Sequence, residues 1–128
     1  MKKILYKYLR TGLKSDNGED RAWKLGTWRI EKGDLDICRN GFHASKTPRQ
    51  ALSYVNGEIL AKVEVRGKSI KKDDKECWSE MRIVEAYYWT KEDSVALAAA
   101  YAAAKIKLTK EVDAWFIKYI KKLKPWKQ

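Results

Sequence analysis

The only histidine of the chain lies in a segment whose residue types could support acid–base chemistry. His43 stands in the run GFHAS, which covers residues 41–45. A neutral imidazole can accept or donate a proton near pH 7. On an extended strand Ser45 would point to the same face as His43, and Glu85 could orient the imidazole in a Ser–His nucleophile arrangement. The alternative is structural: His43 hydrogen-bonds a main-chain group and holds the turn before Pro48.

Cys38 and Cys77 are the only cysteines. They could form one disulfide, but the apolar residues at the start of the chain are interrupted by Lys7 and Arg10, which is not typical of a secretory signal. A reduced pair and a cytoplasmic protein are therefore expected. Two cysteines and one histidine fall short of the ligands of a structural zinc site, so no metal is expected. No stretch approaches the roughly 20 apolar residues of a membrane span.

The net charge of +11 on 128 residues predicts attraction to polyanions. Nucleic acid is the first expectation, followed by an anionic membrane and an acidic protein. Residues 105–128 hold eight lysines and two acidic residues, so the charge is concentrated toward the C-terminal end. The candidate phosphate-binding residues there are Lys110, Lys118, Lys121, Lys122, Lys124 and Lys127. A second basic patch could comprise Arg10, Lys14, Arg21 and Arg29.

Tryptophan alternates with a cationic residue at three places, which is a pattern suited to stacking nucleobases. Two other roles stay open for the lysines: a basic amphipathic helix on a membrane, and a docking surface for an acidic protein. A charged, solvated helix face without a partner would give the same pattern. The three pairs are Trp23-Lys24, Trp28-Arg29 and Trp126-Lys127.

These residues need a sheet to position them. Apolar alternation predicts strands at 3–9, 41–44, 59–66 and 80–89, with a further extended stretch at 23–30. In the strand at 80–89, Met81 and Ile83 are expected on one side, and Val84 and Ala86 on the other. Residues 71–76, KKDDKE, predict a solvated loop.

Three helices are expected. The first begins at Ser45 or Thr47 and ends at Asn56-Gly57. Thr90 begins an alanine-rich second helix with Asp93 at the capping-box position. Thr109 begins the third, and Pro125 ends it. The third helix has an apolar stripe that should pack against the alanine-rich helix, formed by Val112, Trp115, Phe116, Tyr119, Ile120 and Leu123.

The expected fold class is α+β: an N-terminal mixed or antiparallel sheet of about five strands with one helix, followed by two C-terminal helices. The chain is expected to form a single domain over 1–128, with a sheet-rich part at 1–89 and a helical hairpin at 90–124.

The runs LYKYLRTG, GTWRIEKG, CRNGFHASKTPRQALSYVNGEILAKVEVRG and WSEMRIVEAYYW resemble a family of uncharacterised small domains found mainly in phage and prophage proteins. The resemblance covers about the first 90 residues. It implies a viral origin, and therefore the cytoplasm of an infected or lysogenic host cell, more than it implies an activity. The matching positions are Tyr6, Lys7, Cys38, Gly41, Phe42, His43, Ala44, Tyr54 and Glu85.

The order of the elements is also similar to the central part of ADP-ribosyltransferase-type folds. In those folds residues on two strands bind NAD, and a glutamate on a later strand stabilises the reacting ribose. The likeness implies a cleft in which Lys7, His43 and Glu85 act, with Lys7 standing where those folds carry arginine or histidine. The other residues of that cleft would be Tyr6, Ser45 and Tyr54.

Three functions follow as expectations. The first is a small basic phage-type protein that binds nucleic acid or a host nucleoprotein, such as a defence complex, without a cofactor. The second is an NAD-binding transferase-like enzyme, active or decayed. The third is a module that binds a host protein without nucleic acid.

Overall fold

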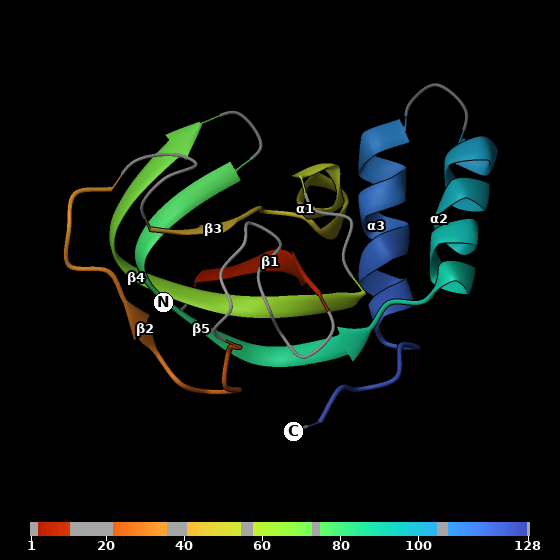
Figure 1. The fold of residues 1–128 in the computed structure, drawn as a ribbon. Coiled ribbons are helices and arrows are strands. Elements are labelled where there is room, and N and C mark those ends of the chain that lie inside the picture. Colours follow the sequence, from red (N-terminus) through yellow and green to blue (C-terminus); the bar gives the residue numbers. More distant parts are fainter. Residues whose placement is uncertain are drawn as a thin grey trace.

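The computed structural model describes residues 3–10, 22–35, 41–54, 58–72, 75–104 and 108–127. It confirms the α+β class: a five-stranded antiparallel sheet with a short helix, followed by two helices (Figure 1). The elements are β1 (Lys3–Leu9), β2 (Arg29–Ile30), β3 (Phe42–Ala44), α1 (Pro48–Tyr54), β4 (Ile59–Lys72), β5 (Lys75–Tyr88), α2 (Lys91–Ala104) and α3 (Leu108–Ile120).

The sheet curls until its two sides meet. Its hydrogen-bonded order is β1-β4-β5-β2, and β3 pairs with another part of β5. Beyond the end of β3, Ser45 exchanges two main-chain hydrogen bonds with Tyr6 of β1, at 2.7 and 2.9 Å. The long strands β4 and β5 bend strongly (Figure 1), which allows this contact. Strands β1, β4, β5 and β3 therefore form a closed, barrel-like ring.

The two faces of the sheet are buried against different partners. Side chains such as Leu5, Val63 and Ile83 point to the inside of the ring and are at most 1% exposed. On the opposite face Tyr8 and Leu60 join a second core that includes residues of α2 and α3. Because successive side chains of a strand alternate between faces, both cores form on the same strands.

A β-bulge at Val84 changes which residues of β5 face the inner core. Lys62 lies opposite Glu85, but the next residue, Val63, lies opposite Ile83. Because Val84 is the extra residue, Ala86 lies on the same side of the strand as Ile83. The expectation that Ala86 lies on the other side from Ile83 was therefore wrong, because a bulge resets the alternation.

The expected loop at residues 71–76 is largely strand. Strand β4 continues to Lys72 and β5 begins at Lys75, with Lys71 opposite Glu76. Glu76 is only 3% exposed, because Lys3 Nζ lies 2.8 Å from its Oε1 and Trp78 Nε1 donates to the same oxygen at 2.9 Å. A charge can be buried when such partners compensate it.

Helix α1 begins as its sequence predicts. Thr47, rather than Ser45, is the capping residue, since its hydroxyl oxygen accepts from Gln50 N at 3.2 Å. Pro48 occupies the first helical position, where it loses no hydrogen bond. The expected stop at Asn56-Gly57 lies outside the described residues.

The capping box of α2 is confirmed. Thr90 N donates to Asp93 Oδ2 at 2.6 Å, and Asp93 N donates to Thr90 Oγ1 at 3.4 Å. Helix α2 lies beside α3 (Figure 1), and its Leu97 is buried in the second core. Its outer side is nevertheless exposed, with Val95 at 63%. The alanine-rich helix is thus only partly the buried partner that the sequence predicts.

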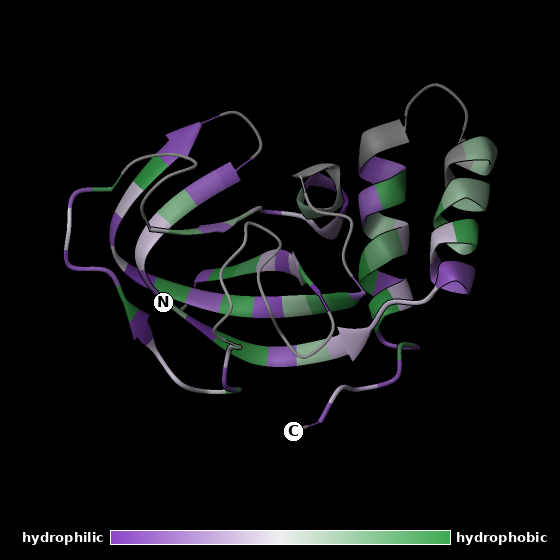
Figure 2. Ribbon diagram, viewed as in Figure 1, coloured by the Kyte–Doolittle hydropathy of each residue, from purple (hydrophilic) through white to green (hydrophobic). Residues whose placement is uncertain are grey.

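The apolar stripe of α3 faces the second core, as expected, and apolar and polar residues alternate around this helix (Figure 2). Phe116 is fully buried, and Trp115 and Tyr119 are partly buried. The bounds differ from expectation. Helix α3 begins at Leu108, so Thr109 is its second residue, and it ends at Ile120, well before Pro125.

The segment after α3 returns to the sheet and adds main-chain pairing at the end of β5. Tyr88 N donates to Lys124 O at 3.0 Å, and Trp126 N donates to Ala86 O at 2.8 Å. The ring of Trp126 packs against the inner core. This pairing fixes the direction of the chain after the last helix.

Candidate functional site

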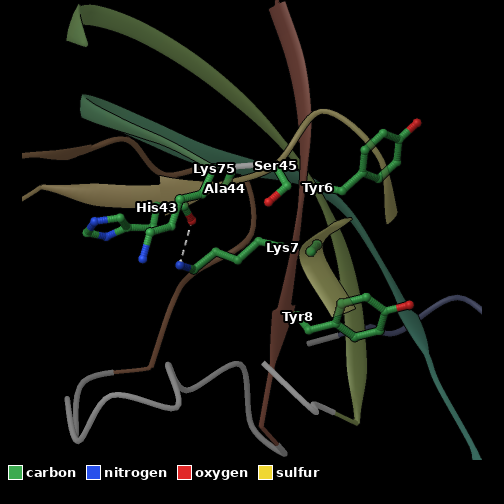
Figure 3. A pocket seen from close by; sticks show the side chains of 8 residues that line it. Tyr6, Lys7, Tyr8, His43, Ala44, Ser45 and Lys75 are labelled. Carbon is green, nitrogen blue, oxygen red and sulfur yellow. Dashed lines mark hydrogen bonds between the residues drawn. The ribbon is translucent and has the colours of Figure 1, made fainter. Parts of the chain in front are cut away.

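Four of the residues predicted for a transferase-like cleft line one small pocket: Tyr6, Lys7, His43 and Ser45 (Figure 3). Lys75 of β5 lines it as well. The closure of the ring brings them together, because Ser45 pairs with Tyr6 and Lys7 Nζ donates to His43 O at 2.8 Å. The pocket has a volume of about 50 Å³. A water molecule takes up about 30 Å³ in the liquid, so the space suits one or two waters.

The environment of His43 disfavours its charged form. Burial lowers the pKa of His43 from 6.5 to about 4, and the ammonium groups of Lys7 and Lys75 contribute to this decrease. The imidazole is therefore neutral at pH 7. A base with this pKa is a weak proton acceptor at neutral pH, so the arrangement favours hydrogen bonding over general-base catalysis.

The tyrosines of β1 point away from His43. The rings of Tyr6 and Tyr8 lie on one side of the strand and the imidazole lies on the other (Figure 3). Tyr8 packs edge-on against Trp89, and burial raises the pKa of its hydroxyl. Its hydroxyl is buried without a hydrogen-bond partner among the described residues. Tyr8 therefore acts mainly as a core residue.

Glu85 does not line this pocket. It lies in a cross-strand row with Lys62 and Tyr6, two strands away from β1, and its side chain is 57% exposed. Its carboxylate accepts a hydrogen bond from Tyr87, and Lys62 Nζ lies 3.8 Å away. Burial and the charge of Glu85 raise the pKa of Tyr6. The structure thus places Glu85 with Tyr6, on the side opposite His43, and does not assemble a Ser45–His43–Glu85 triad.

Other predicted site residues fall outside the description or outside the pocket. Tyr54 belongs to α1, but its side chain is outside the described part, as are Cys38, Lys14 and Arg21. Cys77 is buried. Within the described ranges, no group of three or more His, Cys, Asp or Glu side chains could hold a metal ion, and no helix is long and apolar enough to cross a membrane.

The C-terminal lysines lie along α3, which holds two of them, and the segment that follows it, which holds four. All six are exposed: Lys110, Lys118, Lys121, Lys122, Lys124 and Lys127. Ala114 and Ile117 lie among them on the outer side of α3 and are also exposed. Asp113 is paired with Arg49 of α1, whose Nε lies 2.9 Å from its Oδ1. We call these six lysines the helical basic face.

Arg29, a predicted nucleic-acid-binding residue, is largely buried and offers little surface to a ligand. It is 8% exposed, its guanidinium lies 4.1 Å from the ring centre of Trp23, and its NH2 donates to Ala22 O at 2.7 Å. Trp126 is likewise packed against the core, and Arg66 covers Trp28 at 3.8 Å. These stacking candidates are therefore occupied by contacts within the protein.

The outer face of the sheet is balanced in charge. Arg82 Nε donates to Glu64 Oε1 at 2.6 Å, and Arg66 Nε donates to Glu80 Oε1 at 2.8 Å. With the pair of Lys62 and Glu85, each described cation of this face has an acidic neighbour. A polyanion would thus gain little from this face of the sheet.

Sequence reasoning missed two features. The first is the exposed lysines of the β4–β5 hairpin, Lys68, Lys71 and Lys72, which the loop interpretation passed over. The second is a groove in which Tyr88 lies beside Lys122 and Lys124. The first could have been found by extending the strand alternation beyond Gly67. The second depends on pairing between β5 and the residues after α3, which no local pattern reveals.

The fold and this site define a small α+β domain with a curled sheet and a basic helical layer. The family model described as "Domain of unknown function (DUF7666)" matches residues 3–95, and the chain belongs to this family. This match confirms the expectation that about the first 90 residues form an uncharacterised small domain. No curated protein and no solved structure matches the chain. The family match ends within α2, yet α3 completes the core around Tyr8 and Leu60.

Proposed function

We propose that the protein is a small basic accessory protein of phage type that binds nucleic acid, either free or in a host nucleoprotein. It would act in the cytoplasm of an infected host, where modulation of a defence complex is one role. The supporting observation is the contrast between the two sides of the C-terminal region: Val112, Phe116 and Ile120 of α3 are at most 2% exposed, whereas the two lysines of α3 and the four that follow it are all exposed.

The lysines of this face are not engaged in ion pairs with described residues, although the exposed Glu111 follows Lys110 in α3. The nearby Asp113 is already engaged by Arg49. Lysines in this state attract phosphates by releasing counterions, a mode that is independent of sequence and falls with salt. The exposed lysines of α3 and of the segment after it therefore support non-specific binding to a nucleic-acid backbone.

The experiment is a salt titration of binding to a mixed-sequence fluorescent oligonucleotide. The double variant K118Q/K121Q should weaken binding and make the slope of log K against log salt shallower by about 1.4–1.8, since each phosphate contact contributes roughly 0.7–0.9. The matched control is K24Q/K32Q, which removes two exposed lysines from the part of the chain around β2. It should leave the slope unchanged. No binding of the wild-type protein at low salt would refute the proposal.

A second candidate is the transferase-like enzyme, because Tyr6, Lys7, His43 and Ser45 line one pocket. Two observations favour it less: the pocket has a volume of about 50 Å³, and Glu85 lies outside it. Small-molecule sites usually measure about 300–1,000 Å³. Thermal stabilisation by NAD that is lost in His43→Ala and Glu85→Ala would support this candidate. No shift with NAD would remove it.

A host protein as the sole partner is the third candidate. A pull-down from host lysate after nuclease treatment would separate it from the first, because capture through nucleic acid is lost when the nucleic acid is digested.

A further inference from the structure

A groove lies where the end of β5, the start of α2 and the turn after α3 meet. It has a volume of about 390 Å³, within the range of small-molecule sites. Tyr88 is 40% exposed at its wall. Lys124 Nζ lies over its ring at 5.7 Å from the centre, which is farther than the 3.8 Å between Arg66 and the ring of Trp28. The residues lining it are Tyr88, Thr90, Asp93, Lys122, Leu123 and Lys124.

The position of Tyr88 is fixed by its main chain. It lies opposite Ile59 in the β4–β5 ladder, and its N–H donates to Lys124 O at 3.0 Å. The neighbouring Tyr87 packs against the second core, so alternation along the strand directs Tyr88 to the opposite side. Pairing on both edges of the strand fixes the direction of the Tyr88 side chain, so the backbone needs no further ordering when a ligand stacks on the ring.

The groove is cationic although Asp93 lines it. Both oxygens of Asp93 are occupied: Oδ2 accepts from Thr90 N at 2.6 Å, and Oδ1 accepts from Tyr119 OH at 2.5 Å. That second hydrogen bond, together with burial, raises the pKa of Tyr119 to about 12, so its hydroxyl remains a donor to Asp93. Lys122 and Lys124 are exposed and make no ion pair with any residue in the described ranges.

We propose that this groove is a base-stacking subsite for single-stranded nucleic acid, in which a base stacks on Tyr88 while Lys122 and Lys124 contact the flanking phosphates. This inference rests on the proposed function and specifies its ligand. An exposed aromatic ring beside a cationic track is the arrangement with which proteins hold single strands. In a duplex the base faces are stacked on one another, so the ring would gain nothing from a duplex ligand.

The test measures fluorescence anisotropy of a labelled 12-nucleotide thymidine strand and of a labelled 12-base-pair mixed duplex at about 50 mM salt. Tyr88→Ala should weaken binding to the single strand about tenfold, as expected for loss of one stacked base, and should change duplex binding less than twofold. Tyr88→Phe should bind both as the wild type does, because stacking requires only the ring. Ile30→Ala, which removes an exposed apolar side chain of β2, outside both the groove and the helical basic face, should change neither.

A measurement on the wild-type protein makes the test independent of whether Tyr88→Ala folds. Stacking of a base should move the ring signals of Tyr88 upfield in the NMR spectrum when the thymidine strand is added, and the duplex should not. Equal binding by wild type and Tyr88→Ala, or unmoved Tyr88 ring signals, would overturn the inference. If K118Q/K121Q still weakens binding in that case, the proposed function stands without the subsite. Absence of binding to either ligand would refute both.

Discussion

Lys7 Nζ donates a hydrogen bond of 2.8 Å to the main-chain oxygen of His43, and so links β1 to β3 across 36 residues of sequence. The contact places an ammonium group beside the only imidazole of the protein. It lies next to the pair of main-chain hydrogen bonds between Tyr6 and Ser45 that closes the ring. The ammonium group of Lys7 therefore both lines the pocket and helps to hold β1 against β3.

The titration of His43 tests this environment directly. Because the protein has one histidine, its ring signals in an NMR pH titration are unambiguous. We expect a pKa of about 4, against an ordinary value of 6.5. Lys7→Met should raise the pKa, since it removes a positive charge next to the imidazole. A wild-type pKa near 6.5 would show that the imidazole is neither buried nor close to the lysines.

The same shift predicts a pH dependence of stability. The unfolded chain binds a proton at His43 more readily than the folded protein does, so the free energy of unfolding should decrease as the pH falls from about 6.5 to about 4. His43→Gln retains the main-chain oxygen that accepts from Lys7 and removes the titrating group. Its urea denaturation midpoint should vary less over this pH range. Identical pH profiles for the two proteins would contradict the prediction.

Glu76 provides a second stability test. Burial raises the pKa of its carboxyl, but the hydrogen bonds from Lys3 and Trp78 and the nearby cationic charge outweigh this effect and lower it. Glu76→Gln should reduce the free energy of unfolding at pH 7 by about 1–3 kcal/mol, because Lys3 loses its charged partner at a buried site. The wild type should lose this stabilisation as the pH falls through the lowered pKa, whereas the variant should not.

The control for Glu76 is Glu80→Gln. The partner of Glu80, Arg66, is 52% exposed, so this ion pair is well solvated. The variant should change the free energy of unfolding by about 0–1 kcal/mol. Equal effects of the two substitutions in urea denaturation would show that Glu76 is not buried in a compensated ion pair.

The packing of α3 on the sheet can be tested with two adjacent residues. Phe116 is fully buried against Trp89, with ring centres 5.2 Å apart, whereas Ile117 is 45% exposed. Phe116→Ala should cost about 3–5 kcal/mol in the free energy of unfolding. Ile117→Ala should change it by less than about 0.5 kcal/mol. A small effect of Phe116→Ala would mean that α3 does not complete the core of the family-matched region.

Substitutions at two glycines with positive φ allow the cost of backbone strain to be measured apart from the cost of a steric clash. Gly26 has a φ of +81° and open space where a Cβ would lie, whereas a Cβ on Gly41, at φ +106°, would meet Cys77 Sγ and lie 2.9 Å from Leu35 Cδ2. Gly26→Ala should cost about 1–2 kcal/mol from the left-handed conformation alone. Gly41→Ala should cost about 1–3 kcal/mol more, because it also overpacks the site. Thermal denaturation of both variants would measure the difference.

Local patterns predicted most of the elements. The alternation around Ile59 and Val65, the capping box of Thr90 and Asp93, and the stripe containing Phe116 each depend on neighbours within a few residues. For the same reason the sequence could not place the bulge at residue 84. A bulge is selected by the fit of two strands; here it keeps Glu85 out of the inner core and places Ala86 there.

The sites were less predictable than the elements, because they depend on distant partners. KKDDKE has the composition of a loop, and the burial of Glu76 becomes possible only when Lys3 is brought to it. Arg29 was expected on the surface, but it stacks on Trp23 once β2 pairs with β5. Residue type alone singled out His43, whereas its neutral state follows from its burial and from two lysines that the closed ring places beside it.

The antiparallel pairing of Leu9 with Ile59 has a consequence for synthesis of the chain on the ribosome. Strand β1 is made first, but its partner emerges some fifty residues later. At about 5–20 residues per second, this leaves the nascent segment waiting on the order of 3–10 s with Leu5 and Leu9 uncovered. Strand β1 thus remains unpaired until β4 has been made, and this interval of exposure is where a chaperone would be most useful.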